Sequence, residues 1–184
     1  RIESGKHFSD DLLNSSAMEE LELRDRRLTT EIVYGTLRLQ GLLDYVLAPL
    51  SSKPWADVEQ EPKILLRMSL YQLWHMDRIP DHALVNDAVE LAKSRGKGID
   101  RFVNAILRRL TRVRPWRDGD CLRDAPPWVR VSLPEWLWRR WAERFGESAA
   151  FEYGSALNRP PQAAYRLSEE AVSETVSDLV PGAG

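Results

Sequence analysis

The chain has 184 residues, of which 43% are hydrophobic and 29% charged. This balance is ordinary for a soluble globular protein and excludes wholesale disorder, and no run of about 18 apolar residues is present to span a membrane. The single cysteine, Cys121, cannot form an internal disulfide or build a zinc site, and the three histidines lack metal-ligand spacing. No basic-then-apolar leader follows Arg1, which we interpret as a trimmed start and not as a signal peptide. The single cysteine fits a reducing cytoplasm, and neither a metal site nor a membrane partner is expected.

Helical periodicity dominates the chain to about residue 113. A short helix is predicted with Asp10 or Asp11 as its cap, followed by a longer helix from Asp25 to about Pro49 that Gly41 could divide. The next two predicted helices span residues 63–74 and 80–95. The last helix of this part has the clearest amphipathic pattern, with one apolar face formed by Ile99, Phe102, Val103, Ile106, Leu107 and Leu110.

The composition changes after residue 113, where three prolines occur among Trp, Asp and Arg. We read residues 114–131 as an ordered linker. Ser132 and Glu135 have the spacing of a capping box, which predicts a helix to Gly146 and a second one from Glu147 to about residue 157. The first helix is expected to bury Leu133, Leu137, Trp141 and Phe145.

The end of the chain predicts a single strand over 163–167 and a helix over 169–179. One strand cannot form a sheet, so this segment is expected to be the incomplete start of a second, α+β subdomain. The sequence thus divides into a helical bundle at 1–113, a linker at 114–131 and a helical connector at 132–184.

The net charge of −2 hides an uneven distribution. Eight basic residues and a single acid, Asp100, lie between Leu91 and Arg114, so this segment carries +7. Most of its helical cations fall opposite the apolar face, and such a cluster predicts contact with RNA phosphates. The predicted RNA-binding residues are Lys97, Arg101, Arg108, Arg109, Arg112 and Arg114. The alternative is a solvated charged face. Asn104 lies beside the stripe and is expected to bond between helices, while Gly35 is expected to permit close helix packing.

No catalytic, cofactor-binding or metal-binding residue is predicted. The sequence has no Gly-rich loop between a strand and a helix to hold a nucleotide or S-adenosylmethionine. Cys121 lies in an acidic linker that disfavours a thiolate, so we expect it to be inert. His82 follows Pro80 at a predicted helix start, where its ring can satisfy backbone groups.

Three stretches of the chain resemble one family closely. They are DRRLTTEIVYGTLR at 25–38, residues 64–93 with PDHALVNDAVELAK at their end, and RFVNAILRRL at 101–110. Together they look like the NusB-like domain at the N-terminus of the RsmB (Sun/Fmu) family of 16S rRNA cytosine-C5 methyltransferases. The resemblance continues through SLPEWL at 132–137 and NRPP at 158–161, so it covers nearly the whole chain.

The resemblance implies an all-α, NusB-like bundle that binds RNA, and a connector into a small RNA-binding subdomain from about residue 132. The family uses S-adenosylmethionine and two cysteines of a C-terminal domain to methylate C5 of a cytosine. Those cysteine motifs have no match in these 184 residues, so no catalytic residue is carried over. The implied partners are 16S rRNA and the chain's own C-terminal methyltransferase domain, and no DNA is expected.

Two alternatives remain open. Free-standing NusB, a transcription antitermination factor, shares the helical core. It usually carries Asp where this chain has Arg108, and it ends near that helix, whereas this chain continues for some seventy residues. The domain could also be a protein-interaction module that binds a ribosomal protein or braces its own catalytic domain.

Overall fold

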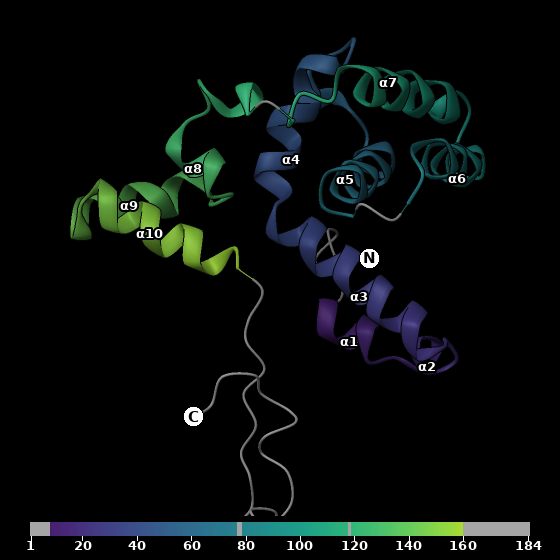
Figure 1. Cartoon of the computed structure of the whole chain (residues 1–184), viewed down its shortest axis with the longest axis horizontal. Helices are drawn as coiled ribbons and strands as arrows, with labels where there is room; N and C mark the ends of the chain where they lie inside the picture. Colours follow the sequence, from purple (N-terminus) through teal and green to yellow (C-terminus); the bar gives the residue numbers. More distant parts are fainter. Residues whose placement is uncertain (1–7, 77–78, 118, 160–184) are drawn as a thin grey trace, which may run out of the picture.

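The computed structural model describes residues 8–76, 79–117 and 119–159, which form helices and no strand (Figure 1). The α-helices are α1 (Ser9–Leu13), α2 (Ser16–Glu19), α3 (Leu23–Arg38), α4 (Gln40–Leu47), α5 (Gln60–His75), α6 (Asp81–Lys93), α7 (Ile99–Val113), α8 (Pro127–Arg130), α9 (Glu135–Phe145) and α10 (Glu147–Leu157). Three short 3-10 helices are η1 (Ala48–Leu50), η2 (Trp55–Asp57) and η3 (Asp120–Leu122). The prediction of an all-α chain is confirmed over these residues, while the strand at 163–167 and the helix at 169–179 lie outside them.

The larger hydrophobic core is built around α5, which contacts α3, α4, α6 and α7 (Figure 1). Leu66 and Leu70 of α5 are fully buried, and each such side chain contributes roughly 1.5–3 kcal/mol by leaving water. The predicted apolar face of α7 is confirmed, because its last four residues, Val103, Ile106, Leu107 and Leu110, are buried, and its first two are partly buried against the same core. Because that face is fixed against the core, the opposite face of α7 must point to solvent.

An ion pair joins α4 to α5 at the edge of this core. The guanidinium of Arg67 donates to both carboxylate oxygens of Asp44, at 2.6 and 2.7 Å. Arg67 is only 4% exposed, so the bidentate bond compensates a charge that has largely left water. The sequence pattern did not predict this contact, because Arg67 lies among apolar residues on a helix.

The packing of α3 on α5 depends on Gly35, as predicted. A methyl group at position 35 would overlap the ring of Tyr71, so only glycine lets the two helices approach this closely. The Tyr71 hydroxyl donates to Glu31 Oε1 at 2.5 Å. Burial, together with this hydrogen bond, raises the pKa of Tyr71 to about 12.

The predicted caps of the early helices are wrong. α3 begins at Leu23, and Asp25 lies inside its first turn, while Asp10 and Asp11 lie inside the first turn of α1. Acidic side chains in a first turn still stabilise the helix through its dipole, which explains why they mark the start only approximately. The break between α3 and α4 falls at Leu39, not at Gly41.

Ser132 does not form the predicted capping box. α9 begins at Glu135 after Pro134 and has no side-chain cap. The Ser132 hydroxyl instead accepts hydrogen bonds from the backbone N–H groups of Gly41 and Leu42, at 3.1 and 3.4 Å. These N–H groups belong to the first turn of α4, where no earlier carbonyl can accept them. Ser132 therefore caps a helix that is distant in sequence.

A second, smaller core joins α8, α9 and α10, in which Val131, Trp138 and Ala150 are buried. The predicted apolar face of α9 is confirmed in part, because Leu133 and Trp141 pack against this core, whereas Phe145 is 47% exposed. Trp138, which was not predicted to be buried, is only 4% exposed. Leu133, Leu137 and Trp141 are half-buried. Gly154 of α10 faces Val131 so closely that a methyl group there would lie 2.9 Å from Val131 Cβ.

The described part of the predicted linker packs against both cores. Trp116 packs against the larger core, Trp128 against the smaller one, and Ala125 is buried. The short helices η3 and α8 lie within this segment. The division of the chain at residues 113 and 131 stays a prediction. The contacts of these side chains with the two cores are a physical reason why a linker in this position would be ordered.

Candidate nucleic-acid interface

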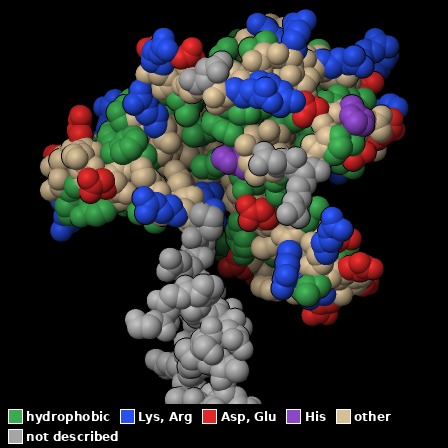
Figure 2. All heavy atoms as spheres, viewed as in Figure 1, with side chains coloured by type: hydrophobic (Ala, Val, Ile, Leu, Met, Phe, Trp, Pro, Cys, Tyr) green, Lys and Arg blue, Asp and Glu red, His purple; other side chains and the backbone are tan. Residues whose placement is uncertain are grey.

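The predicted RNA-binding residues are carried by α7 and the loop before it. Arg101, Arg108, Arg109 and Arg112 are exposed on α7. Lys97 is exposed too, but it precedes the helix, which begins after Gly98 with φ at 84°. Lys and Arg side chains gather over the α7 region, at the upper right of the space-filling view (Figure 2). From position 101 to 112 the helix axis covers about 16 Å.

Carboxylates from other segments neutralise some cations of the basic segment. Glu90 pairs with Lys93 at 2.5 Å, and Glu61 of α5 pairs with Arg95 at 3.5 Å. The Lys93 hydrogen bond to Glu90 raises the pKa of that ammonium. Asp100 is therefore not the only acid near the basic segment, because Glu90 directly precedes the segment in sequence and Glu61 reaches it from α5.

Arg114 is the predicted site residue that the structure separates from the others. Its guanidinium donates to Asp81 at the start of α6 and to the carbonyl of Thr111. The residue ends α7 in a left-handed conformation, with φ at 44°, and its side chain is only 30% exposed. These bonds hold the end of α7 against the beginning of α6, so the contacts of Arg114 are those of a structural residue.

The remaining five cations have no ion pair among the described residues. We call them the basic surface, and they are Lys97, Arg101, Arg108, Arg109 and Arg112. The attraction of such cations for an anion from outside is not offset by a paired carboxylate. The structure thus leaves a local positive surface on a chain whose net charge is −2.

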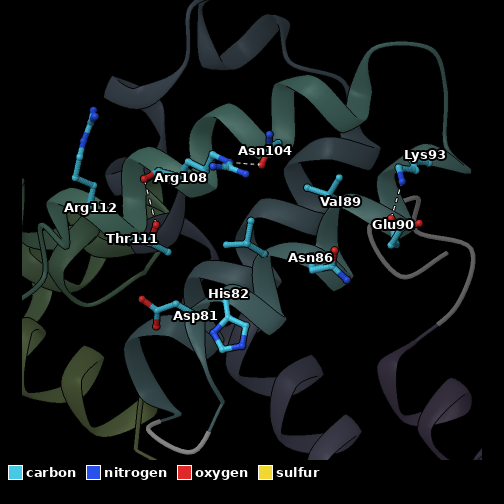
Figure 3. Close-up of a pocket in the computed structure, with 11 residues that line it drawn as sticks. Asp81, His82, Asn86, Val89, Glu90, Lys93, Asn104, Arg108, Thr111 and Arg112 are labelled. Atoms are coloured by element: carbon cyan, nitrogen blue, oxygen red, sulfur yellow. Dashed lines mark hydrogen bonds and ion pairs between the residues drawn. The ribbon is translucent and has the colours of Figure 1, made fainter.

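A groove of about 680 Å³ runs between α6 and α7 beside the basic surface (Figure 3). Arg108 and Arg112 line it from α7, together with Asn104. The Asn104 side-chain oxygen accepts a hydrogen bond from Arg108 Nε at 2.9 Å. The expected bond from Asn104 to another helix is therefore wrong, because Asn104 orients an arginine one turn along its own helix.

The α6 wall of this groove was not predicted as part of a site. His82, Val85, Asn86, Val89 and Lys93 line it, and they follow the i, i+3, i+4 spacing of one helix face. That spacing is visible in the sequence, but only the packing of α6 on α7 shows what the face meets. The N-cap residue of α6 is Pro80, which makes no side-chain cap, and the role of the His82 ring in satisfying backbone groups at this helix start stays a prediction.

A second hollow of about 380 Å³ lies at the start of α7. Lys97 and Arg101 line it with Asp100 and the glycines of the preceding loop. Lys93 borders both hollows, so the two adjoin. Four residues of the basic surface therefore line one or the other of these two hollows, and Arg109 lies outside both linings.

Cys121 is half-buried and packs against the larger core. Burial raises the pKa of its thiol, which lowers the thiolate fraction at neutral pH. Across the described ranges, no group of three or more His, Cys, Asp and Glu side chains could hold a metal ion. No helix within those ranges is long and apolar enough to cross a membrane.

The bundle and its basic helix define the class of protein. The sequence matches the NusB family over residues 2–112, and the chain belongs to this family.

The similarity to individual proteins extends beyond that domain. The chain is 38% identical over 177 residues to the probable ribosomal RNA small subunit methyltransferase B of Bacillus subtilis, covering 92% of this chain and 38% of that protein. The ribosomal RNA small subunit methyltransferase B of Thermus thermophilus is 40% identical over 137 residues, covering 74% of this chain and 30% of that protein. The chain thus spans well under half the length of these relatives.

Proposed function

We propose that this chain is the RNA-binding N-terminal region of an S-adenosylmethionine-dependent 16S rRNA cytosine-C5 methyltransferase. In this proposal the basic surface holds the rRNA for a catalytic domain outside these residues, and the chain itself binds no S-adenosylmethionine. The names of the relatives, and the match to them beyond residue 112, favour this function over a free-standing antitermination factor. The observation that supports RNA binding is the basic surface itself, four cations on α7 and one in the loop before it, none of which has an ion pair among the described residues.

The physical basis of this binding is phosphate neutralisation. Each Lys or Arg that contacts a phosphate releases condensed counterions, so affinity falls as salt rises. If four phosphates are engaged, the slope of log K against log salt is about −3 for single-stranded RNA. Because phosphates carry no sequence information, this contribution tolerates any RNA sequence.

A second candidate function is contact with another protein, favoured by the helical hairpin of α9 and α10. Trp136 is 65% exposed and Tyr153 is 49% exposed, and Phe145, Phe151 and Leu157 are exposed on the same pair of helices. Aromatic residues are enriched in protein interfaces. A ribosomal protein or the chain's own catalytic domain would be the partner in this reading.

The test of RNA binding is the double variant Arg101→Glu with Arg108→Glu. Fluorescence anisotropy on a 16S rRNA hairpin at two salt concentrations should show weaker binding and a shallower salt slope, by about 0.7 for each lost phosphate contact. Thermal melts should be nearly unchanged, because exposed substitutions usually alter stability by no more than roughly 0.5 kcal/mol each.

The matched control is Arg140→Glu with Arg144→Glu, which makes the same charge change at two exposed positions of α9. If RNA binding depends on the basic surface, the control keeps most of the affinity. Equal losses in both variants would show that only net charge matters. Unchanged affinity in the α7 variant would refute the proposal and favour protein contact.

A further inference from the structure

We infer that the groove between α6 and α7 receives one unpaired nucleotide of the RNA, with the phosphate on α7 and the base toward α6. This inference rests on the proposed RNA-binding function. It adds the kind of RNA that is bound, a single-stranded stretch or a loop, and it assigns a base-contacting role to α6.

The two walls of the groove differ in charge. Arg108 and Arg112 on the α7 wall have no carboxylate partner among the described residues. On the α6 wall the carboxylates of Asp81 and Glu90 are already paired, with Arg114 and Lys93. An anionic group is therefore favoured on the α7 side, whereas the α6 side suits a neutral polar group.

A nucleotide has this same division, because its phosphate is anionic and its base is neutral. An acidic peptide would bring carboxylates to both walls, including the one that holds Glu90, and is therefore disfavoured. The size also fits, since sites for small organic ligands measure about 300–1,000 Å³ and this groove measures about 680 Å³.

The α6 wall offers the two kinds of contact that a base needs. Val85 and Val89 are half-buried and present apolar surface to the groove, against which the flat face of a base can lie. Asn86 is exposed and makes no hydrogen bond to any described residue. Its amide can donate and accept at once, the combination that reads the edge of a base.

Asn104 completes the arrangement from the α7 wall (Figure 3). Its oxygen accepts from Arg108 at 2.9 Å, while its NH₂ group remains for an acceptor in the groove. A single side chain thus lies between the phosphate-binding arginine and the space for the base.

Duplex RNA does not fit this arrangement. Neighbouring helix axes are about 8–10 Å apart, so the groove between them is too narrow for a double helix. The bases of a duplex are also stacked and paired, and proteins that contact base edges in RNA bind unpaired nucleotides. A duplex could reach only the exposed cations on the rim.

The test compares three RNAs on the 184-residue chain by fluorescence anisotropy: an unstructured 12-nucleotide strand, the same strand with abasic sites, and its duplex. We expect the intact strand to bind most tightly. Asn86→Ala should weaken its binding on the order of 10-fold without changing the salt slope, because no phosphate contact is lost. Binding of the abasic strand and the duplex should not change. The matched control is Asn14→Ala, at an exposed asparagine of the C-terminal end of α1.

The possible failures are distinct. If Arg101→Glu with Arg108→Glu abolishes binding but Asn86→Ala does not, the groove inference is overturned and the proposed RNA binding remains. If neither variant affects the binding of any of the three RNAs, both proposals fall. Competition by an oligoglutamate peptide that Asn86→Ala relieves would assign the groove to an acidic protein segment and would also overturn the inference.

Discussion

Replacing Gly35 by alanine should destabilise the bundle, although alanine is the better helix former. The added methyl group would overlap the Tyr71 ring, which is 5% exposed and lies on the central helix α5. The ring belongs to the larger hydrophobic core, where side chains are closely packed. Relief therefore requires α3 to shift away from α5 or Tyr71 to leave its rotamer, and either change weakens the hydrogen bond to Glu31.

The expected size follows from three contributions. Alanine gains about 1 kcal/mol over glycine in a helix interior. Overpacking a core costs typically about 1–3 kcal/mol, and weakening a hydrogen bond to a charged group adds about 1.5–3 kcal/mol when the bond is lost completely. The net result is a loss of about 2 kcal/mol in the free energy of unfolding. For a chain of this length that lowers Tm by roughly 4–8 °C.

Urea denaturation followed by tryptophan fluorescence measures this change, since the chain contains seven tryptophans. The matched control is Gly41→Ala in α4, where the new methyl group would lie an ordinary 3.5 Å from Ser132 Oγ. We expect that control to be neutral or slightly stabilising. In a Tyr71→Ala background, Gly35→Ala should no longer be harmful. A Gly35→Ala variant as stable as the control would refute the packing argument.

Three further predictions concern stability, each measured by urea denaturation. The pKa of Tyr71 is about 12 in the fold against about 10 in an unfolded chain. The neutral phenol therefore stabilises the fold below pH 10, and this contribution to the free energy of unfolding is lost as the pH rises through 12. The variant Tyr71→Phe should not show this loss of stability between pH 10 and 12. Asp44→Ala should cost about 3 kcal/mol, because the buried Arg67 guanidinium loses this carboxylate; a cost below 1 kcal/mol would contradict it. Ser132→Ala should cost about 1 kcal/mol, whereas an unchanged midpoint would show that water replaces the hydroxyl.

The sequence pattern was sufficient to predict the features that depend on residues close together in the chain. The apolar residues of α7 repeat at helical spacing, so its buried face and the exposed arginines opposite followed from one helix alone. Gly35 was also interpretable, because a glycine within a strongly helical segment usually marks a close approach. The positions of the helices were predicted well, and their first residues less well.

Contacts that are distant in sequence explain the remaining errors. Ser132 has the spacing of a local cap, but its hydroxyl is used by α4, and no rule of spacing reveals that competitor. Glu61 and Asp81 neutralise cations of the basic segment from other helices. The groove residue Asn86 could not be assigned before the packing of α6 on α7 was known.

Because Ser132 caps α4 from a distant part of the chain, the first turn of α4 is sensitive to movement of the α8–α10 unit. The amide hydrogens of Gly41 and Leu42 are protected by a side chain that is 91 and 90 positions away in sequence. If the unit of α8 to α10 moves away from the bundle while α4 stays folded, those two amides lose their acceptor and exchange with solvent. Their exchange rates, compared with those of amides deeper in α4, would therefore measure the free energy of separating the two cores without unfolding either one.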